Sequence, residues 1–97
     1  MSLHGNPVFE SAHLPDGRNA RIRVGIAEDP YVADKDSTTV VLEVRVGNGV
    51  AAVIDTVLAP DQVEAARHLA ARVRDGLASG DLEPATSSLE RLADEVL

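Results

Sequence analysis

The chain has 97 residues, enough for one domain with a single hydrophobic core, and it carries 16 acidic against 9 basic side chains for a net charge of −7. That charge disfavours binding to nucleic acid and to anionic membranes. The chain has no cysteine, which excludes a disulfide framework, a thiolate zinc site and a cysteine nucleophile, and its one Phe and one Tyr leave the core to Val, Leu, Ile and Ala.

Residues 1–6 are interpreted as a tail, either disordered or left over from cloning, and residues 7–97 as a single domain. The N-terminus lacks the basic and apolar regions of a secretory signal, and no apolar run approaches the roughly 18–20 residues that a membrane-spanning helix needs. We therefore expect a cytoplasmic protein that does not enter a membrane.

The first hairpin is predicted from two strands that flank a Pro-Asp-Gly turn. The strand over 7–14 is weakly patterned and leaves open whether Val8 or Phe9 enters the core. The strand over 20–26 alternates apolar residues with Arg and Gly, as a half-buried strand does. Residues 29–37 then interrupt the pattern with Pro and charged residues, which predicts an irregular loop.

A second hairpin is predicted from strands over 38–46 and 50–58, joined by the turn Gly47-Asn48-Gly49. Its register has two solutions. A three-residue loop gives three core-facing pairs, namely Val46 with Val50, Val44 with Ala52 and Leu42 with Ile54. A two-residue Asn-Gly loop, Asn48-Gly49, instead places Val53 opposite Val44. We prefer the first solution because it keeps Asp55 out of the core.

Two helices are predicted after the strands, over 60–79 and 86–97. In the first, apolar residues recur at steps of three and four, as on the buried face of an amphipathic helix. Gly80 is expected to end it, while Gly76 either lets another part of the chain approach closely or ends the helix earlier. The second begins at a capping-box pattern that starts at Ser87.

These elements predict an α+β fold of two layers, with the order ββββαα. Two hairpins form a four-stranded antiparallel sheet, and the 60–79 helix packs on one of its faces. The 86–97 helix either completes the helix layer or crosses to a partner molecule.

The segment LAPDQVEAARHLAARV follows a valine-rich strand and opens the first predicted helix. It resembles the strand-to-helix passage of small uncharacterised actinobacterial α+β proteins. The resemblance rests on residues common at helix starts and in helix packing, namely Leu58, Pro60, Ala65, Leu69 and Ala70. It implies no activity, because these proteins have none assigned.

The polar residues predict no catalytic, cofactor-binding or metal site. Glu64, His68 and Arg72 recur at helical spacing, but one His and one carboxylate do not hold a metal, so we interpret them as a solvated helix face. The segment 34–37 has the acidic start of a calcium loop without its required Gly and Glu. We expect no cofactor and no enzymatic activity.

Arg18, Arg21 and Arg23 form a basic strip on the outward face of the second predicted strand. The strip is a possible contact for an anion or an acidic partner, with Glu10 placed across the hairpin to neutralise Arg23. A solvated strand face that discourages aggregation is the preferred interpretation. No aromatic residues interleave the arginines for base stacking, so nucleic-acid binding is not expected.

The preferred register leaves apolar side chains on the outer face of the sheet, where either the C-terminal helix or a second subunit must cover them. The candidate interaction residues are apolar positions of the last two strands and the second helix: Val41, Val53, Val57, Leu89, Leu92 and Val96. We therefore expect a small non-enzymatic protein-interaction module that acts as a homodimer. The alternative is a small-ligand binder or minor enzyme with a cleft between sheet and helix.

Overall fold

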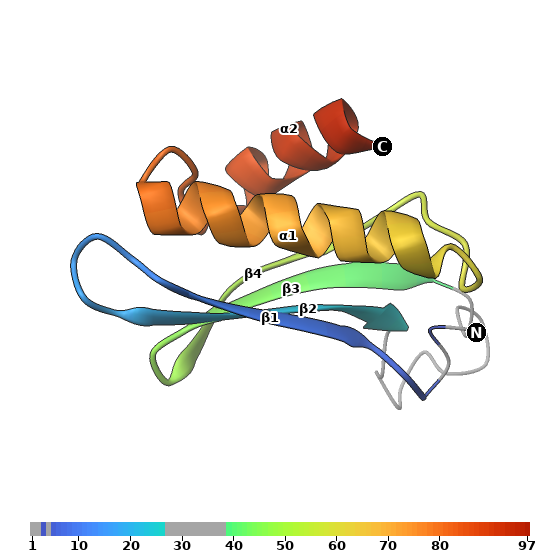
Figure 1. The fold of residues 1–97 in the computed structure, drawn as a ribbon, viewed down its shortest axis with the longest axis horizontal. Helices are drawn as coiled ribbons and strands as arrows, with labels where there is room; N and C mark the ends of the chain where they lie inside the picture. Colours follow the sequence, from blue (N-terminus) through green and yellow to red (C-terminus); the bar gives the residue numbers. More distant parts are fainter. Residues whose placement is uncertain (1–2, 4, 27–38) are drawn as a thin grey trace.

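A computed structural model of the protein describes residues 3, 5–26 and 39–97. Four strands form one antiparallel sheet in the order β1-β2-β3-β4: β1 Val8–His13, β2 Asn19–Ile26, β3 Val40–Val46 and β4 Gly49–Asp55. Two helices follow, α1 Val63–Ser79 and α2 Thr86–Val96, and both lie on the same side of the sheet (Figure 1). The predicted α+β class and the order ββββαα are confirmed. The loop predicted over 29–37 lies outside the described residues.

The first hairpin places Val8 on the core side and Phe9 on the other. Val8 lies opposite Val24 and packs against the core, whereas the Phe9 side chain is 66% exposed. The turn is closed by the N–H of Leu14, which donates to the carbonyl oxygen of Arg18 at 2.8 Å. The choice that the sequence left open in the first strand is thus settled by pairing with the second.

The second hairpin follows neither predicted register completely. Its turn consists of Gly47 and Asn48, because Val46 pairs with Gly49, so the predicted pair of Val46 with Val50 is wrong. The alternative pair of Val53 with Val44 is also wrong, since Val53 lies opposite Glu43. A β-bulge then leaves Ala51 without a cross-strand partner and shifts the register by one residue. The predicted pairs of Val44 with Ala52 and Leu42 with Ile54 are confirmed as a result. The bulge keeps apolar residues on the core face despite the short turn.

The core lies between the sheet and the two helices. Helix α1 contacts β1 and β2, α2 contacts β4, and the two helices touch each other. The largest fully buried side chains come from every layer: Leu3, Ile22, Val24, Val40, Leu42, Val44, Leu69, Val73, Leu77 and Leu89. Of the two predicted positions for the second helix, it takes the one that completes the helix layer.

Helix α1 starts later than predicted, and α2 starts at the predicted residue but without the predicted cap. Helix α1 begins at Val63 rather than at residue 60, because Gln62 first closes a turn: its side-chain oxygen accepts the N–H of Ala59 at 2.7 Å. Helix α2 begins at Thr86 without a side-chain cap, so the capping box predicted from Ser87 does not form. Ser87 lies inside the first turn, where its hydroxyl is not at the capping position.

Leu3 belongs to the packed domain and not to the predicted tail. Its side chain is buried in the core cluster, and its N–H donates to the carbonyl oxygen of Pro60 at 2.7 Å. This contact ties the N-terminal segment to the residues that precede α1.

The connection between the helices depends on two glycines. Gly80 ends α1 with a φ of +84°, as predicted, a conformation that glycine adopts without strain. The N–H of Leu82 then donates to the carbonyl oxygen of Gly76 at 3.0 Å, which folds the chain back over the helix. A β-carbon at position 76 would lie 2.8 Å from the Cβ of Leu82. Gly76 therefore permits close approach of the chain and does not end the helix.

Candidate functional site

One face of the sheet carries no helix in the part of the chain that the structure describes (Figure 1). Cross-strand pairing arranges its side chains in two rows. The first row is Phe9, Arg23, Glu43 and Val53, and the second is Ser11, Arg21, Arg45 and Val50. We call these eight residues the open sheet face. An open groove of about 670 Å³ runs across it over β1, β2 and β3.

The open sheet face holds three guanidinium groups and one carboxylate. Arg21 lies directly opposite Arg45 in the pairing of β2 with β3, a like-charge arrangement that disfavours folding. Arg45 compensates in part, since its Nε lies 2.7 Å from Oε1 of Glu43. Arg23 lies opposite Glu43 and donates to the carbonyl oxygen of Ile26 at 3.2 Å. Among the described residues, the Arg21 side chain has no hydrogen-bond or ion-pair partner.

Two of the three arginines predicted as a strip lie on this face, and the third does not. Arg18 is in the turn after β1, where its Nε lies 2.6 Å from Oδ2 of Asp16. Its backbone N–H also donates to Oδ1 of the same carboxylate at 3.0 Å. Arg45 completes the cluster instead. Arg45 belongs to another strand, so the pattern of the second strand does not indicate it, although its own outward position in the third strand is a signal.

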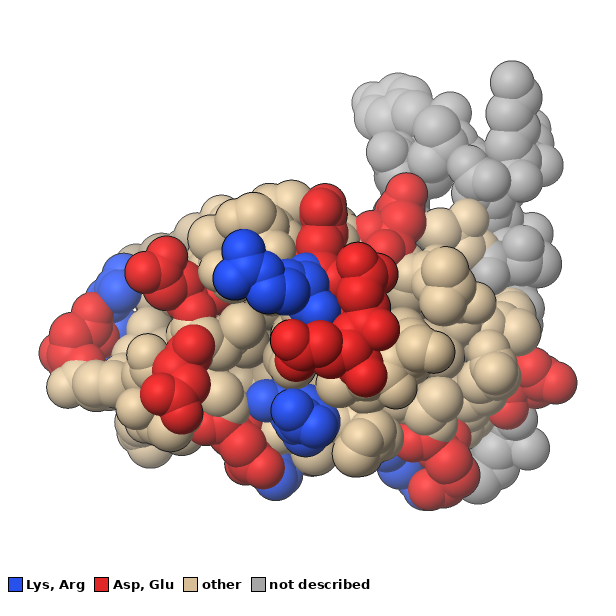
Figure 2. Space-filling view, turned by 90° about the horizontal axis from the view of Figure 1, so that it is seen from above, with Lys and Arg blue, Asp and Glu red and all other residues tan. Residues whose placement is uncertain are grey.

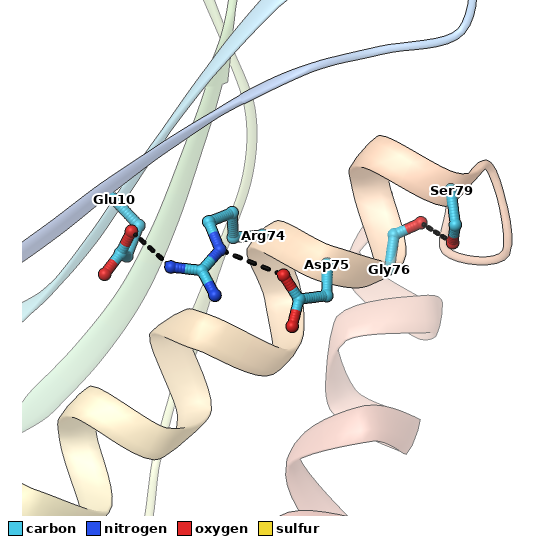
Figure 3. A network of polar contacts seen from close by, with 5 residues as sticks. All are labelled: Glu10, Arg74, Asp75, Gly76 and Ser79. Atoms are coloured by element: carbon cyan, nitrogen blue, oxygen red, sulfur yellow. Dashed lines mark hydrogen bonds and ion pairs between the residues drawn. The ribbon is translucent and has the colours of Figure 1, made fainter.

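The expected neutralisation of Arg23 by Glu10 is wrong. Glu10 lies opposite the buried Ile22, on the face toward the helices, and its Oε1 is 3.0 Å from a guanidinium nitrogen of Arg74. Figure 3 shows Arg74 between this carboxylate and that of Asp75, which is also 3.0 Å away. Arg74 donates hydrogen bonds to both carboxylates, and these bonds, first that to Asp75 and then that to Glu10, raise the pKa of Arg74 above its usual value. This network joins β1 to α1.

The predicted apolar interaction residues separate into three groups. Val41 and Leu89 are buried, and Leu92 and Val96 are half-buried against the core. These four residues therefore offer little surface to a partner. The C-terminal helix was one of the two elements predicted to cover the apolar residues on the outer face of the sheet. Helix α2 lies on the opposite side of the sheet and does not cover them.

Two of the predicted interaction residues are exposed. Val53, 47% exposed, lies on the open sheet face. Val57, 86% exposed, follows β4 and lines a smaller groove of about 400 Å³ with Leu97 at the end of α2. These positions define two separate surfaces.

The described residues give little support for a catalytic or metal site elsewhere. The space between sheet and α1, where a cleft was considered, is filled by the buried core. A hollow of about 770 Å³ between the helices is lined by charged side chains, among them Arg72, Asp81 and Glu95. Within residues 3, 5–26 and 39–97, no three His, Asp or Glu side chains gather as metal ligands. Neither α1 nor α2 is long and apolar enough to span a membrane.

Substituting Arg21 with Thr is expected to raise the free energy of unfolding by about 0.2–1 kcal/mol, because it removes the like charge opposite Arg45 and introduces a good strand former. Urea denaturation at low salt measures the change. Arg23→Thr, two residues along the same face but opposite Glu43, is the matched control and should lower the free energy of unfolding. A loss of stability in Arg21→Thr would contradict the repulsion.

The pKa of Asp16 is expected to lie below that of an ordinary exposed Asp. The backbone N–H of Arg18 lowers this pKa most, and the Arg18 guanidinium lowers it further. The turn is therefore stabilised above the ordinary carboxyl pKa, and this contribution is lost as the pH falls through the lowered folded-state pKa. Carboxyl NMR titration measures the shift. Arg18→Ala should restore only part of it, and an unshifted Asp16 would contradict the turn geometry.

The residues of the open sheet face thus come together from all four strands, and among the described residues the guanidinium of Arg21 has no partner. Comparisons with models of known protein families, with curated proteins and with solved structures find no significant match to the chain, so its function is inferred from its own residues.

Proposed function

We propose that this protein is a small non-enzymatic interaction module that binds a protein partner through the open sheet face. The observation that carries the proposal is the exposed Phe9, which lies in one row with Arg23 and Val53 on a face that the helices leave bare. Aromatic residues and arginine are the side chains that contribute most to protein interfaces.

The chemistry of the face supports binding more than catalysis. A general acid or base must exchange a proton near neutral pH, and guanidinium groups stay protonated there. The one carboxylate in the two rows, Glu43, is held by Arg45 at 2.7 Å. These groups are suited to orient an acidic or amide-bearing surface by hydrogen bonds.

The sheet edge at β4 is less suited to a partner than the face. The bulge at Ala51 interrupts the regular spacing of backbone groups in this outermost strand. Bulges of this kind hinder the addition of another strand to an edge. We therefore place the partner on the side chains of the open sheet face.

A homodimer is the second proposal, and a different surface favours it. Val57 and Leu97, 86% and 42% exposed, share the groove between β4 and α2 and would lose water contact against a second copy. Light scattering at micromolar concentration tests this: a dimer that Val57→Ser converts to a monomer would support the second proposal. A mass equal to one chain would exclude it.

The first proposal is tested by retention of a partner from native host extract on immobilised protein. We expect Phe9→Ser to lose a protein that the unsubstituted chain retains, because the substitution removes the main apolar group of the face. Val57→Ser is the control, since it changes an apolar residue that is even more exposed than Phe9 and lies away from the face. A partner retained by Phe9→Ser but lost by Val57→Ser would overturn the proposal.

A further inference from the structure

The open sheet face is basic, although the protein as a whole is acidic. Its two rows carry Arg21, Arg23 and Arg45 against Glu43, and Asp55 lies one row further along the same face. The segment 59–97, which forms the helices, carries eight acidic and four basic residues. Figure 2 looks onto this helix layer and shows acidic side chains spread across it. The net charge is thus positive in the two rows of the sheet face and negative in the helix segment.

Resting on the proposed function, we propose that the partner presents an acidic segment to the open sheet face. A carboxylate of the segment lies between Arg21 and Arg45, and an apolar side chain of the segment packs on Phe9. Arg21 and Arg45 are cross-strand partners, so one carboxylate reaches both guanidinium groups and relieves their repulsion.

The charges on the face argue against the two other occupants. A second copy packed face to face would bring arginines against arginines, which costs free energy in a site that excludes water. A nucleic acid would be repelled by the net charge of −7, and the two rows offer one aromatic ring for base stacking. An acidic protein segment gives Arg21 a partner, relieves its repulsion with Arg45 and also uses Phe9 and Val53.

The probe that tests the proposal is a short synthetic peptide rich in Glu with a central Leu. Its titration into isotopically labelled protein, followed by NMR, is expected to shift the amides of β1, β2 and β3 around the two rows. Binding should weaken as salt is added, because the contacting charges are exposed and are screened. The matched peptide with Gln in place of Glu should bind about tenfold more weakly or worse.

Variants of the protein locate the contact. Arg21→Gln and Arg45→Gln should each weaken binding of the Glu peptide about tenfold. Arg18→Gln is the control, since Arg18 lies in the turn after β1, outside the two rows, and the affinity should be unchanged. All three positions are exposed, so the substitutions leave the core intact.

Several outcomes would overturn the proposal. They are no amide shifts with the Glu peptide at millimolar concentration, tighter binding of a short oligothymidylate, or equal affinity for the Glu and Gln peptides. If the Glu and Gln peptides bound with equal affinity and shifted the same amides, the proposed function would still hold, and only the acidic character of the partner would be contradicted. If the mass of the protein in solution rose with its concentration, and Arg21→Gln prevented that rise, the occupant of the face would be the helix layer of a second copy.

Discussion

Replacing Leu89 with Ala is expected to lower the free energy of unfolding by about 2–5 kcal/mol, the largest effect of the substitutions considered. Leu89 is fully buried in the core cluster, and Ala93 is the other residue of α2 that the structure buries. A helix of 11 residues is marginal in isolation and depends on tertiary packing. Urea denaturation followed by circular dichroism measures the loss.

Leu97→Ala provides the control for this result. Leu97 caps the same helix but is 42% exposed, so its truncation should change the free energy of unfolding by at most about 0.5 kcal/mol. If both variants lost the same small amount, α2 would not be docked on the sheet in solution. A large loss of stability in Leu89→Ala and a small one in Leu97→Ala would support the packing of α2 on the sheet.

Gly76→Ala is expected to lower the free energy of unfolding by about 1–3 kcal/mol, because the added methyl group overlaps Leu82. The closest approach, 2.8 Å, is to the Cβ of Leu82, which moves only if the backbone moves. Helix propensity alone predicts the opposite sign, since Ala is favoured over Gly by about 1 kcal/mol inside a helix. Thermal or urea denaturation therefore decides between the two effects by sign.

A double-mutant cycle isolates the contact between these two residues. In a chain that already carries Leu82→Ala, much of the overlapping side chain is gone, and Gly76→Ala should cost far less than in the unsubstituted chain. Equal costs in the two backgrounds would mean that Leu82 is not the obstacle. A gain in stability from Gly76→Ala alone would show that the chain does not turn back over α1 as described.

The open sheet face shows how much of the candidate site the sequence contained. Alternation in the second strand located Arg21 and Arg23 on the outward face, and the structure agrees. The pairing of Arg18 with Asp16 was also local, two residues apart, and an Asp before an Arg in a turn was a signal for it. Arg45 was not assigned because its distance from Arg21 depends on strand pairing.

The sequence by itself determined the elements and their order. Strands and helices repeat their apolar residues every two or 3.6 positions, and turns contain glycine, so each element depends on residues close together in the chain. Only the tertiary structure decided the bulge at Ala51, the side on which α2 packs and the ion pair of Glu10 with Arg74. Each of these depends on residues far apart in the chain, whose approach is set by filling one shared core.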